Sequence, residues 1–283
     1  MNERAPAELE LCAGTVRQAA LPELIQVAGQ AGFAAITANP TLRAEAGVDD
    51  RTLQTMMADA GVRVTNIDGM GSVLPGIPAG EAIDAYRDYH GRDIRRVFWT
   101  PEDEFYRTAD ALGGNSVNLV HMAGDPDTPR AALVDRLGEV SQRAAAHGLT
   151  IVLEFLPGTG VASLDSAAGL VAEVAAPNLK ITLDARHLAN SGGGPGDVAR
   201  HAAMIGLLQM DDLARASADD PERLLPGDGE LPLVEILSPV REASPALPVG
   251  IEVFNAGLFA MPAIDAAKAA AASLRRLLDE CGR

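Results

Sequence analysis

Four consecutive apolar segments in the second half of the chain each end in a side chain that carries oxygen. TIVLEFLPG contains Glu154, LKITLDARH contains Asp184, IGLLQMDD contains Gln209 and PVGIEVFN contains Glu252. One such residue would more often bond a loop or an ion-pair partner. Three carboxylates brought together in a buried place would repel one another, and burial itself penalises their charge unless they are paired or bound to a cation. If the fold brings these ends together, the pattern predicts a divalent-metal site.

The elements that must position these residues alternate regularly along the chain. Short apolar segments typical of strands and longer alanine-rich segments typical of helices follow one another in eight pairs, which favours a parallel sheet with helices outside. Strands are expected near 8–13, 33–37, 62–67, 115–121, 149–155, 179–184, 204–210 and 247–253, and helices near 20–31, 50–60, 79–97, 128–147, 163–175, 197–202, 230–243 and 262–281.

Eight strand–helix pairs are the number that closes into a (β/α)8 TIM barrel, an α/β fold whose active sites lie at the carboxyl ends of the strands. We therefore expect residues 1–283 to form a single TIM-barrel domain with the four polar residues at its mouth. An open doubly wound sheet is the rival architecture. It is disfavoured because no GxGxxG sequence follows the first strand.

Local signals agree with these boundaries. Gly32, Gly61 and Gly148 each stand between a predicted helix and a strand, where a left-handed residue ends a helix. Ser163 is a suitable first residue for the helix that follows it. Residues 101–114 are interpreted as extra helical material before the fourth strand.

Composition limits the classes of partner. The formal net charge is −16, so nucleic acid and anionic membrane surfaces would be repelled at long range. No apolar stretch of about 18 residues or more suggests a membrane span. Two cysteines, Cys12 and Cys281, cannot build a disulfide framework, and the acidic N-terminal sequence is unlike a secretory signal, so a cytoplasmic protein is expected. The sequence leaves the oligomeric state open, including a homo-oligomer.

The motifs themselves resemble a known superfamily. IVLEFLPG, LKITLDARHLANSGG, LLQMDD, RLLPGDGELPL and VGIEVFN are similar to segments of the xylose-isomerase-like barrels, also called sugar phosphate isomerase/epimerase or apurinic endonuclease family 2. The resemblance covers essentially the whole chain. It implies one metal ion held by a Glu, an Asp, a His and a Glu after strands five to eight, which correspond here to Glu154, Asp184, Gln209 and Glu252.

The chain departs from that pattern at Gln209, where most relatives have His. An amide oxygen replaces an imidazole nitrogen, so the ligand set would consist of oxygen alone. Hard cations such as Mn²⁺ or Mg²⁺ are then favoured over Zn²⁺, with Co²⁺ an alternative.

Three further residues are candidates for contact with substrate. His187 lies in the family's Asp-x-x-His arrangement, in which the His usually meets a substrate oxygen. His121 ends the fourth predicted strand and serves either acid–base chemistry or loop structure. Arg223 precedes PGDGELPL, and either clamps a substrate carboxylate or phosphate or caps the loop.

A cation in such a site would act as a Lewis acid and stabilise an enediolate after removal of a proton α to a carbonyl. Glu154, Glu252, His187 and His121 are the candidate proton carriers. The expected activity is an isomerase or epimerase of a small polyhydroxylated carbonyl compound: a sugar, ketose or cyclitol. A dehydratase of the 3-dehydroshikimate or inosose type would share the first step, and a non-catalytic sugar-binding barrel is a third alternative.

Two other barrel activities are excluded. A Schiff-base aldolase needs a lysine at the mouth, but Lys180 begins the sixth strand and Lys268 lies in the last helix. An endonuclease with a three-metal cluster would need more histidines than the five present and a less acidic chain.

Overall fold

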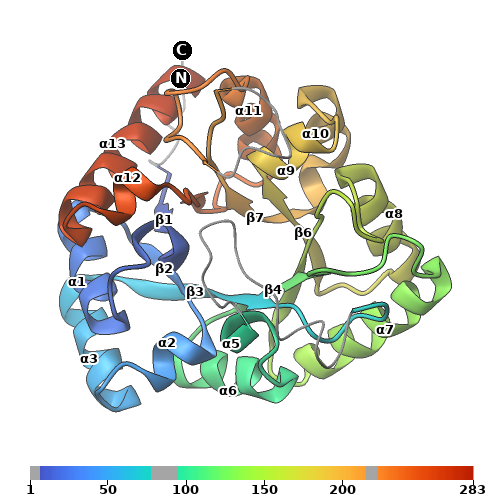
Figure 1. The fold of residues 1–283 in the computed structure, drawn as a ribbon, viewed down its shortest axis with the longest axis horizontal. Coiled ribbons are helices and arrows are strands. Elements are labelled where there is room, and N and C mark those ends of the chain that lie inside the picture. The colour runs from blue at the N-terminus through green and yellow to red at the C-terminus, as the bar shows by residue number, and fades with distance from the viewer. Residues whose placement is uncertain (1–6, 78–94, 215–221, 283) are drawn as a thin grey trace.

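The computed structural model describes residues 7–77, 95–214 and 222–282. Eight parallel strands form one sheet in the order β7-β6-β5-β4-β3-β2-β1-β8. Their bounds are β1 Leu9–Leu11, β2 Ala35–Ala38, β3 Arg63–Met70, β4 Ser116–Val120, β5 Thr150–Glu154, β6 Leu179–Asp184, β7 Ile205–Gln209 and β8 Val249–Ile251. Figure 1 shows these strands at the centre of a ring of helices.

The two ends of this sheet meet through the residue that follows β7. Met210 N donates a hydrogen bond to Gly250 O (2.9 Å), and Glu252 N donates one to Met210 O (3.1 Å). The strands thus make a nearly closed barrel, and the predicted TIM-barrel fold is confirmed. Closure also places Gln209 beside Glu252, although 43 residues separate them in the sequence.

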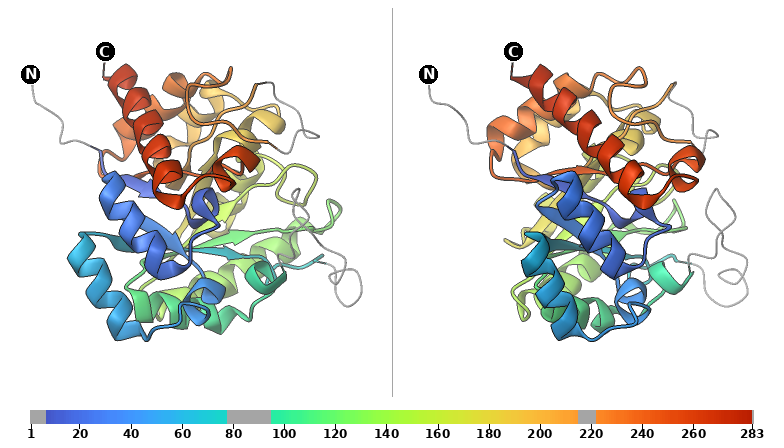
Figure 2. Two further views of the ribbon diagram at one scale, coloured as in Figure 1. Left: turned by 60° about the vertical axis from the view of Figure 1, so that its left-hand side comes forward. Right: turned by 90° about the vertical axis from the view of Figure 1, so that its left-hand side faces the viewer.

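The main helices surround the strands. They are α1 Leu21–Ala31, α3 Asp50–Ala60, α6 Glu102–Leu112, α7 Arg130–Ala145, α8 Leu164–Val174, α10 Pro195–His201, α11 Leu233–Ala243 and α13 Ala263–Cys281. Shorter helices are α2 Pro40–Ala44, α5 Arg95–Phe98, α9 Ala185–Asn190 and α12 Ala256–Phe259, with 3-10 turns η1 Ala13–Val16 and η2 Ala202–Met204. Figure 2 shows α13 lying along α1, so the last helix completes the ring beside the first.

The helix predicted at 101–114 is confirmed as α6, but its role differs from the one expected. It is not additional material, because it packs against β3 and β4 as a member of the outer ring. Its buried face carries Phe105, Tyr106 and Leu112, which explains why it docks on the strands. The helix expected at 79–97 lies mostly outside the described residues; α5 is the part that is described.

The predicted helix boundaries are confirmed where they depend on local chemistry. Gly61 ends α3 with a φ of 65°, the left-handed region in which glycine is favoured. The Ser163 hydroxyl accepts a hydrogen bond from Ser166 N (3.2 Å), and Ser163 N donates to Ser166 Oγ (3.1 Å), which makes a reciprocal cap at the start of α8.

Barrel closure depends on the absence of a side chain at Gly250. A Cβ there would lie 2.1 Å from the carbonyl oxygen of Leu208 on β7. We expect Gly250→Ala to lower the free energy of unfolding by about 1–3 kcal/mol, the usual effect of overpacking. Chemical denaturation followed by circular dichroism measures it.

Gly138 in α7 provides the matched control. Its added Cβ would meet nothing nearer than Val174 Cγ1 at 4.0 Å. Gly138→Ala should therefore raise the free energy of unfolding by about 0.5–1 kcal/mol, because alanine is the better helix former. Equal stability of the two variants would contradict the assigned role of Gly250.

Candidate metal and substrate site

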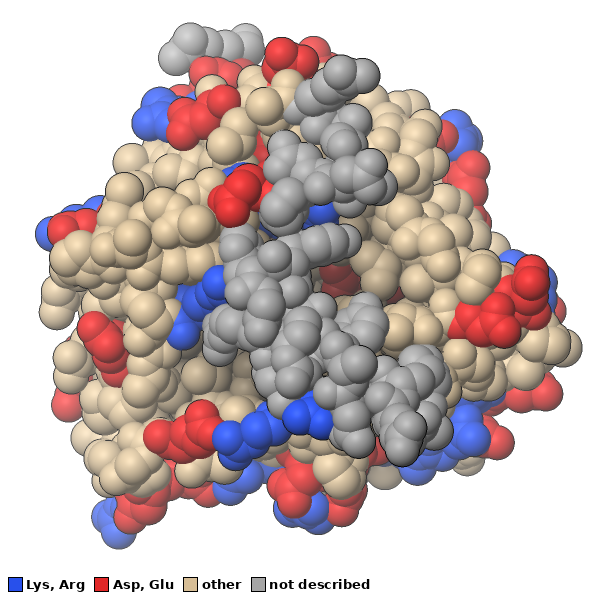
Figure 3. All heavy atoms as spheres, viewed as in Figure 1, with Lys and Arg blue, Asp and Glu red and all other residues tan. Residues whose placement is uncertain are grey.

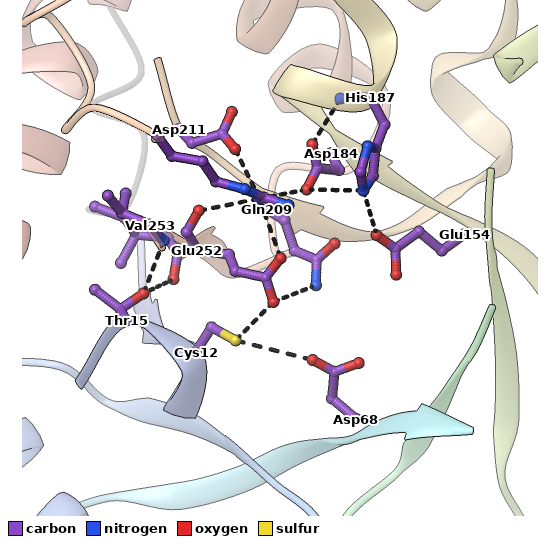
Figure 4. A network of polar contacts seen from close by, with 12 residues as sticks. Cys12, Thr15, Asp68, Glu154, Asp184, His187, Gln209, Asp211, Glu252 and Val253 are labelled. Carbon is purple, nitrogen blue, oxygen red and sulfur yellow. Dashed lines mark hydrogen bonds and ion pairs between the residues drawn. The ribbon is translucent and has the colours of Figure 1, made fainter. Parts of the chain in front are cut away.

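The four residues expected to bind a metal lie together at the carboxyl ends of their strands (Figure 4). Glu154, Asp184 and Gln209 are the last residues of β5, β6 and β7, and Glu252 directly follows β8. All four side chains are buried. Asp184 pairs in register with Gln209 across β6 and β7, so parallel pairing alone brings these two to one level of the mouth.

The Gln209 side chain is oriented by Glu252. Gln209 Nε2 donates a hydrogen bond to Glu252 Oε1 (3.1 Å). Gln209 Oε1 is buried and has no hydrogen-bond partner among the described residues. A buried acceptor without a partner is costly, and a bound cation would satisfy it.

Arg223 enters this cluster from the loop after β7. Its Nη1 donates to Asp184 Oδ2 (2.6 Å), Asp211 Oδ2 (2.7 Å) and Glu252 Oε2 (3.1 Å). The side chain is buried, and its guanidinium group lies 4.8 Å from the centre of the Phe254 ring. The structure therefore places Arg223 among the protein's own carboxylates. Its expected contact with an anionic substrate group stays a prediction.

A second carboxylate from the same region holds the loop that carries Arg223. Asp212 Oδ2 accepts from Gly227 N (3.0 Å) and Gly229 N (3.1 Å), and its Oδ1 accepts from Leu231 N (3.0 Å). Three backbone donors around one carboxylate fix the conformation of the PGDG segment. This accounts for the adjacent pair of aspartates in LLQMDD: Asp211 contacts Arg223, and Asp212 anchors its loop.

Arg223, together with Arg186 beside Asp211, does not fully offset the effect of burial on the acids around it. Burial raises the pKa of Asp184, but the charges of Arg223 and His187 outweigh this and hold that pKa below its ordinary value. Burial raises the pKa of Glu252 well above its ordinary value despite Arg223, and burial together with the charge of Asp184 does the same for Asp211. The cluster is short of positive charge.

His187 lies at the edge of the cluster on α9. Its Nε2 is 3.3 Å from Glu154 Oε1 and 3.8 Å from Asp184 Oδ2. Asp184 Oδ1 accepts a hydrogen bond from His187 N (2.8 Å) and so caps the first turn of α9. The Asp-x-x-His spacing is thus a helix cap that also directs the imidazole toward the mouth.

The structure does not bring His121 into this cluster. Its Nε2 lies 2.8 Å from Pro75 O, and the ring packs beside Gly124 and Gly160. Burial lowers the pKa of His121, so the neutral ring is favoured. Of the two roles expected for His121, these contacts support the structural one.

Three polar residues at the mouth were missed in the sequence: Cys12, Asp68 and Asn118. Cys12 Sγ lies 3.0 Å from Glu252 Oε1, and Asn118 Nδ2 donates to Glu154 Oε2 (2.6 Å). Asp68 follows the point where the third strand was expected to end, at residue 67, whereas β3 continues to Met70. The one acidic residue of this strand, in the segment NIDGMG, was the available signal.

These residues fit a divalent cation. The orphaned Gln209 Oε1, the shortage of positive charge and the oxygen-rich donor set all favour one. The candidate ligand atoms of Glu154, Asp184 and His187 also lie within 4.8 Å of one another. Figure 3 shows acidic atoms at the floor of a hollow near the centre of this face.

The sequence matches the family described as xylose isomerase-like TIM barrel over residues 25–278, which is most of the chain. The chain belongs to the xylose isomerase-like TIM barrel family. Membership confirms the resemblance inferred from the strand-end motifs.

Curated relatives are enzymes with related names. A 3-dehydroshikimate dehydratase of Pseudomonas aeruginosa is 28% identical over 252 residues, which is 86% of this chain and 37% of that protein. An inosose isomerase of Halalkalibacterium halodurans is 28% identical over 147 residues, which is 50% of this chain and 52% of that protein. The chain thus matches about a third to a half of the length of these relatives.

Solved structures share the fold. The IOLI protein, whose crystal structure has a bound zinc atom, superposes with a TM-score of 0.78 and 19% identity over 96% of this chain and 98% of that one.

Among the described residues, none of the helices has the length and hydrophobicity that a membrane crossing requires.

The ligand set leads to a direct prediction. Glu154→Ala and Asp184→Ala should each lose most of the bound divalent metal, because each removes an oxygen from the cluster. Elemental analysis after extensive dialysis measures the metal content per chain.

His187→Ala is the matched variant, since it changes the same cluster but should keep its metal. Full metal retention in both carboxylate variants would refute the site. Metal loss in His187→Ala would instead make His187 a ligand.

Proposed function

We propose that the protein is a divalent-metal-dependent dehydratase that removes water from a small polyhydroxylated carbonyl compound. The observation that carries this proposal is the convergence of Glu154, Asp184, Gln209 and Glu252 at one end of the barrel, with His187 Nε2 at 3.3 Å from Glu154. A cation held by these four residues would supply a Lewis acid for a carbonyl oxygen.

The side chains around that position would transfer the proton and hold the acidic cluster in place. His187 is the best-placed base for a proton α to the carbonyl, because its ring is directed to the mouth and is held by the cap at Asp184. Glu154 and Glu252 are the alternative proton carriers. Arg223 holds Asp184 and Glu252 in fixed orientations, which preserves the geometry of the acidic cluster before substrate arrives.

Two products are compatible with removal of the α-proton. Loss of a β-hydroxyl gives dehydration, and return of a proton to carbon gives isomerisation or epimerisation. The similarity to a 3-dehydroshikimate dehydratase extends over 86% of this chain, and this favours dehydration. The similarity to an inosose isomerase over half of the chain keeps isomerisation as the second candidate.

The metal preference follows from Gln209. An all-oxygen site should give most activity with Mn²⁺, Mg²⁺ or Co²⁺, whereas the zinc-containing structural relative raises Zn²⁺ as the competitor. We expect Gln209→His to shift the preference of metal-free protein toward Zn²⁺ or Co²⁺, measured as activity and as metal affinity in parallel. A wild-type protein activated best by Zn²⁺ would show that the hard-ligand argument is wrong.

The reaction itself is tested by proton exchange. In D₂O the metal-loaded protein should introduce deuterium α to the carbonyl of a suitable substrate, and NMR should show water loss from the same compound. The panel comprises 3-dehydroshikimate, inososes and ketoses. His187→Ala should slow exchange by roughly 10²–10⁴-fold, the usual contribution of a general base.

His201 provides the control, since it is a surface histidine paired with Asp165. His201→Ala should leave exchange unchanged. Exchange without water loss would favour the isomerase. Neither exchange nor water loss from any of the panel would favour a non-catalytic binding barrel.

A further inference from the structure

Asp68 faces the acidic cluster from the side opposite His187. It lies on β3, whereas His187 lies on α9 after β6, and the candidate metal ligands stand between the two in Figure 4. Its side chain is only partly buried. A substrate bound at the cluster would therefore meet His187 on one side and Asp68 on the other.

One oxygen of Asp68 is held in place by a buried amide. Asn118 Nδ2 donates to Asp68 Oδ1 (2.8 Å) and to Glu154 Oε2 (2.6 Å). The Thr182 hydroxyl donates to Asn118 Oδ1 (2.7 Å), which fixes the orientation of that amide. Asn118 therefore positions Asp68 relative to a candidate metal ligand.

The other oxygen of Asp68 has little to bind within the described part of the chain. Asp68 Oδ2 faces the Cys12 thiol at 3.8 Å, a long and weak contact. Arg223 forms its ion pairs with Asp184, Asp211 and Glu252, and among the described residues none joins it to Asp68. One carboxyl oxygen is thus left for a substrate hydroxyl.

The placement of this carboxyl group suits a general acid. Asn118 holds one of its oxygens, and the other, which has only the long contact with Cys12, is the one that would carry a proton to a leaving group.

We propose that Asp68 is a second catalytic residue, which protonates the hydroxyl group that leaves the substrate. The inference rests on the proposed dehydratase function and deepens it. After the α-proton has been transferred to the base, the electron pair left on carbon forms the C=C bond, and the C–O bond to the β-hydroxyl breaks. The hydroxyl takes the proton of Asp68 and departs as water, which leaves Asp68 as a carboxylate that regains its proton from solvent.

Asp68→Asn is the main test, because it removes the proton donor and keeps an oxygen to accept from Asn118. We expect α-proton exchange with 3-dehydroshikimate to stay within about threefold of wild type, while water loss falls by roughly 10²–10⁴-fold. Asp68→Glu, which keeps an acid, should retain more elimination than Asp68→Asn. Metal content should be unchanged in both.

Glu10 provides the matched control. It is a buried carboxyl group on β1 that accepts a hydrogen bond from Thr65 Oγ1 (2.7 Å), and burial raises its pKa to about 7. Glu10→Gln should leave the ratio of elimination to exchange unchanged. An analogue with fluorine in place of the β-hydroxyl needs no proton to depart, so Asp68→Asn should eliminate fluoride at close to the wild-type rate.

The outcomes separate this inference from the proposed function. If wild type exchanges the α-proton and loses water but Asp68→Asn does so equally well, the role of Asp68 is wrong and the dehydratase stands. The role of Asp68 would also be overturned if Asp68→Asn slowed fluoride loss as much as water loss. The same holds if Asp68→Asn and Asp68→Glu slowed water loss equally. Loss of metal from Asp68→Asn would make Asp68 a ligand, in line with the proximity of Cys12, Asp68 and Glu252. If wild type never loses water, both proposals fall.

Discussion

Repulsion between buried carboxylates is the constraint on which this site depends. Parallel pairing sets Asp184 level with Gln209 and places Glu154 beside Thr182 on β6, and closure through Met210 adds the residue after β8. Acidic side chains at those positions cannot avoid one another. Arg223 contacts three of the carboxylates, and the buried Arg186 adds its charge beside Asp211. A divalent cation would add to this balance, in keeping with the proposed metal site.

The rest of the mouth serves to hold those charges in place. Asp212 accepts hydrogen bonds from three backbone amides of the PGDGELPL segment, which fixes the loop that carries Arg223. One oxygen of Asp184 caps α9 by accepting from His187 N, and the other accepts from Arg223. These two contacts set the position of His187. Each acidic residue has a specific partner, so the geometry is established by the protein before any ligand binds.

Much of this was predictable because it follows from local pattern. Apolar segments alternating with helices gave eight strands, and a polar residue at the end of a strand must point to the mouth of a barrel. Asp68 lies beyond residue 67, where the apolar pattern predicts the end of the third strand, and Asn118 lies inside a strand, so strand-end polarity marks neither residue. The contacts of Arg223 could not be foreseen, since they depend on how a loop folds back over the sheet. The helical pattern of α6 is visible in the sequence, but its place in the outer ring is not, because that depends on tertiary packing.

The two sides of the mouth differ in a way that bears on the product. An enzyme that only moves a proton between neighbouring carbons needs one or two bases close to the metal, and His187, Glu154 and Glu252 meet that need. Water loss asks for more, because hydroxide is a poor leaving group and must be protonated as the C–O bond breaks. Asp68 occupies the side away from His187, held by Asn118 and beyond the ion pairs of Arg223. A half-buried acid in that place has a clear use in elimination and a lesser one in isomerisation, so the asymmetry of the mouth is consistent with the proposed dehydratase.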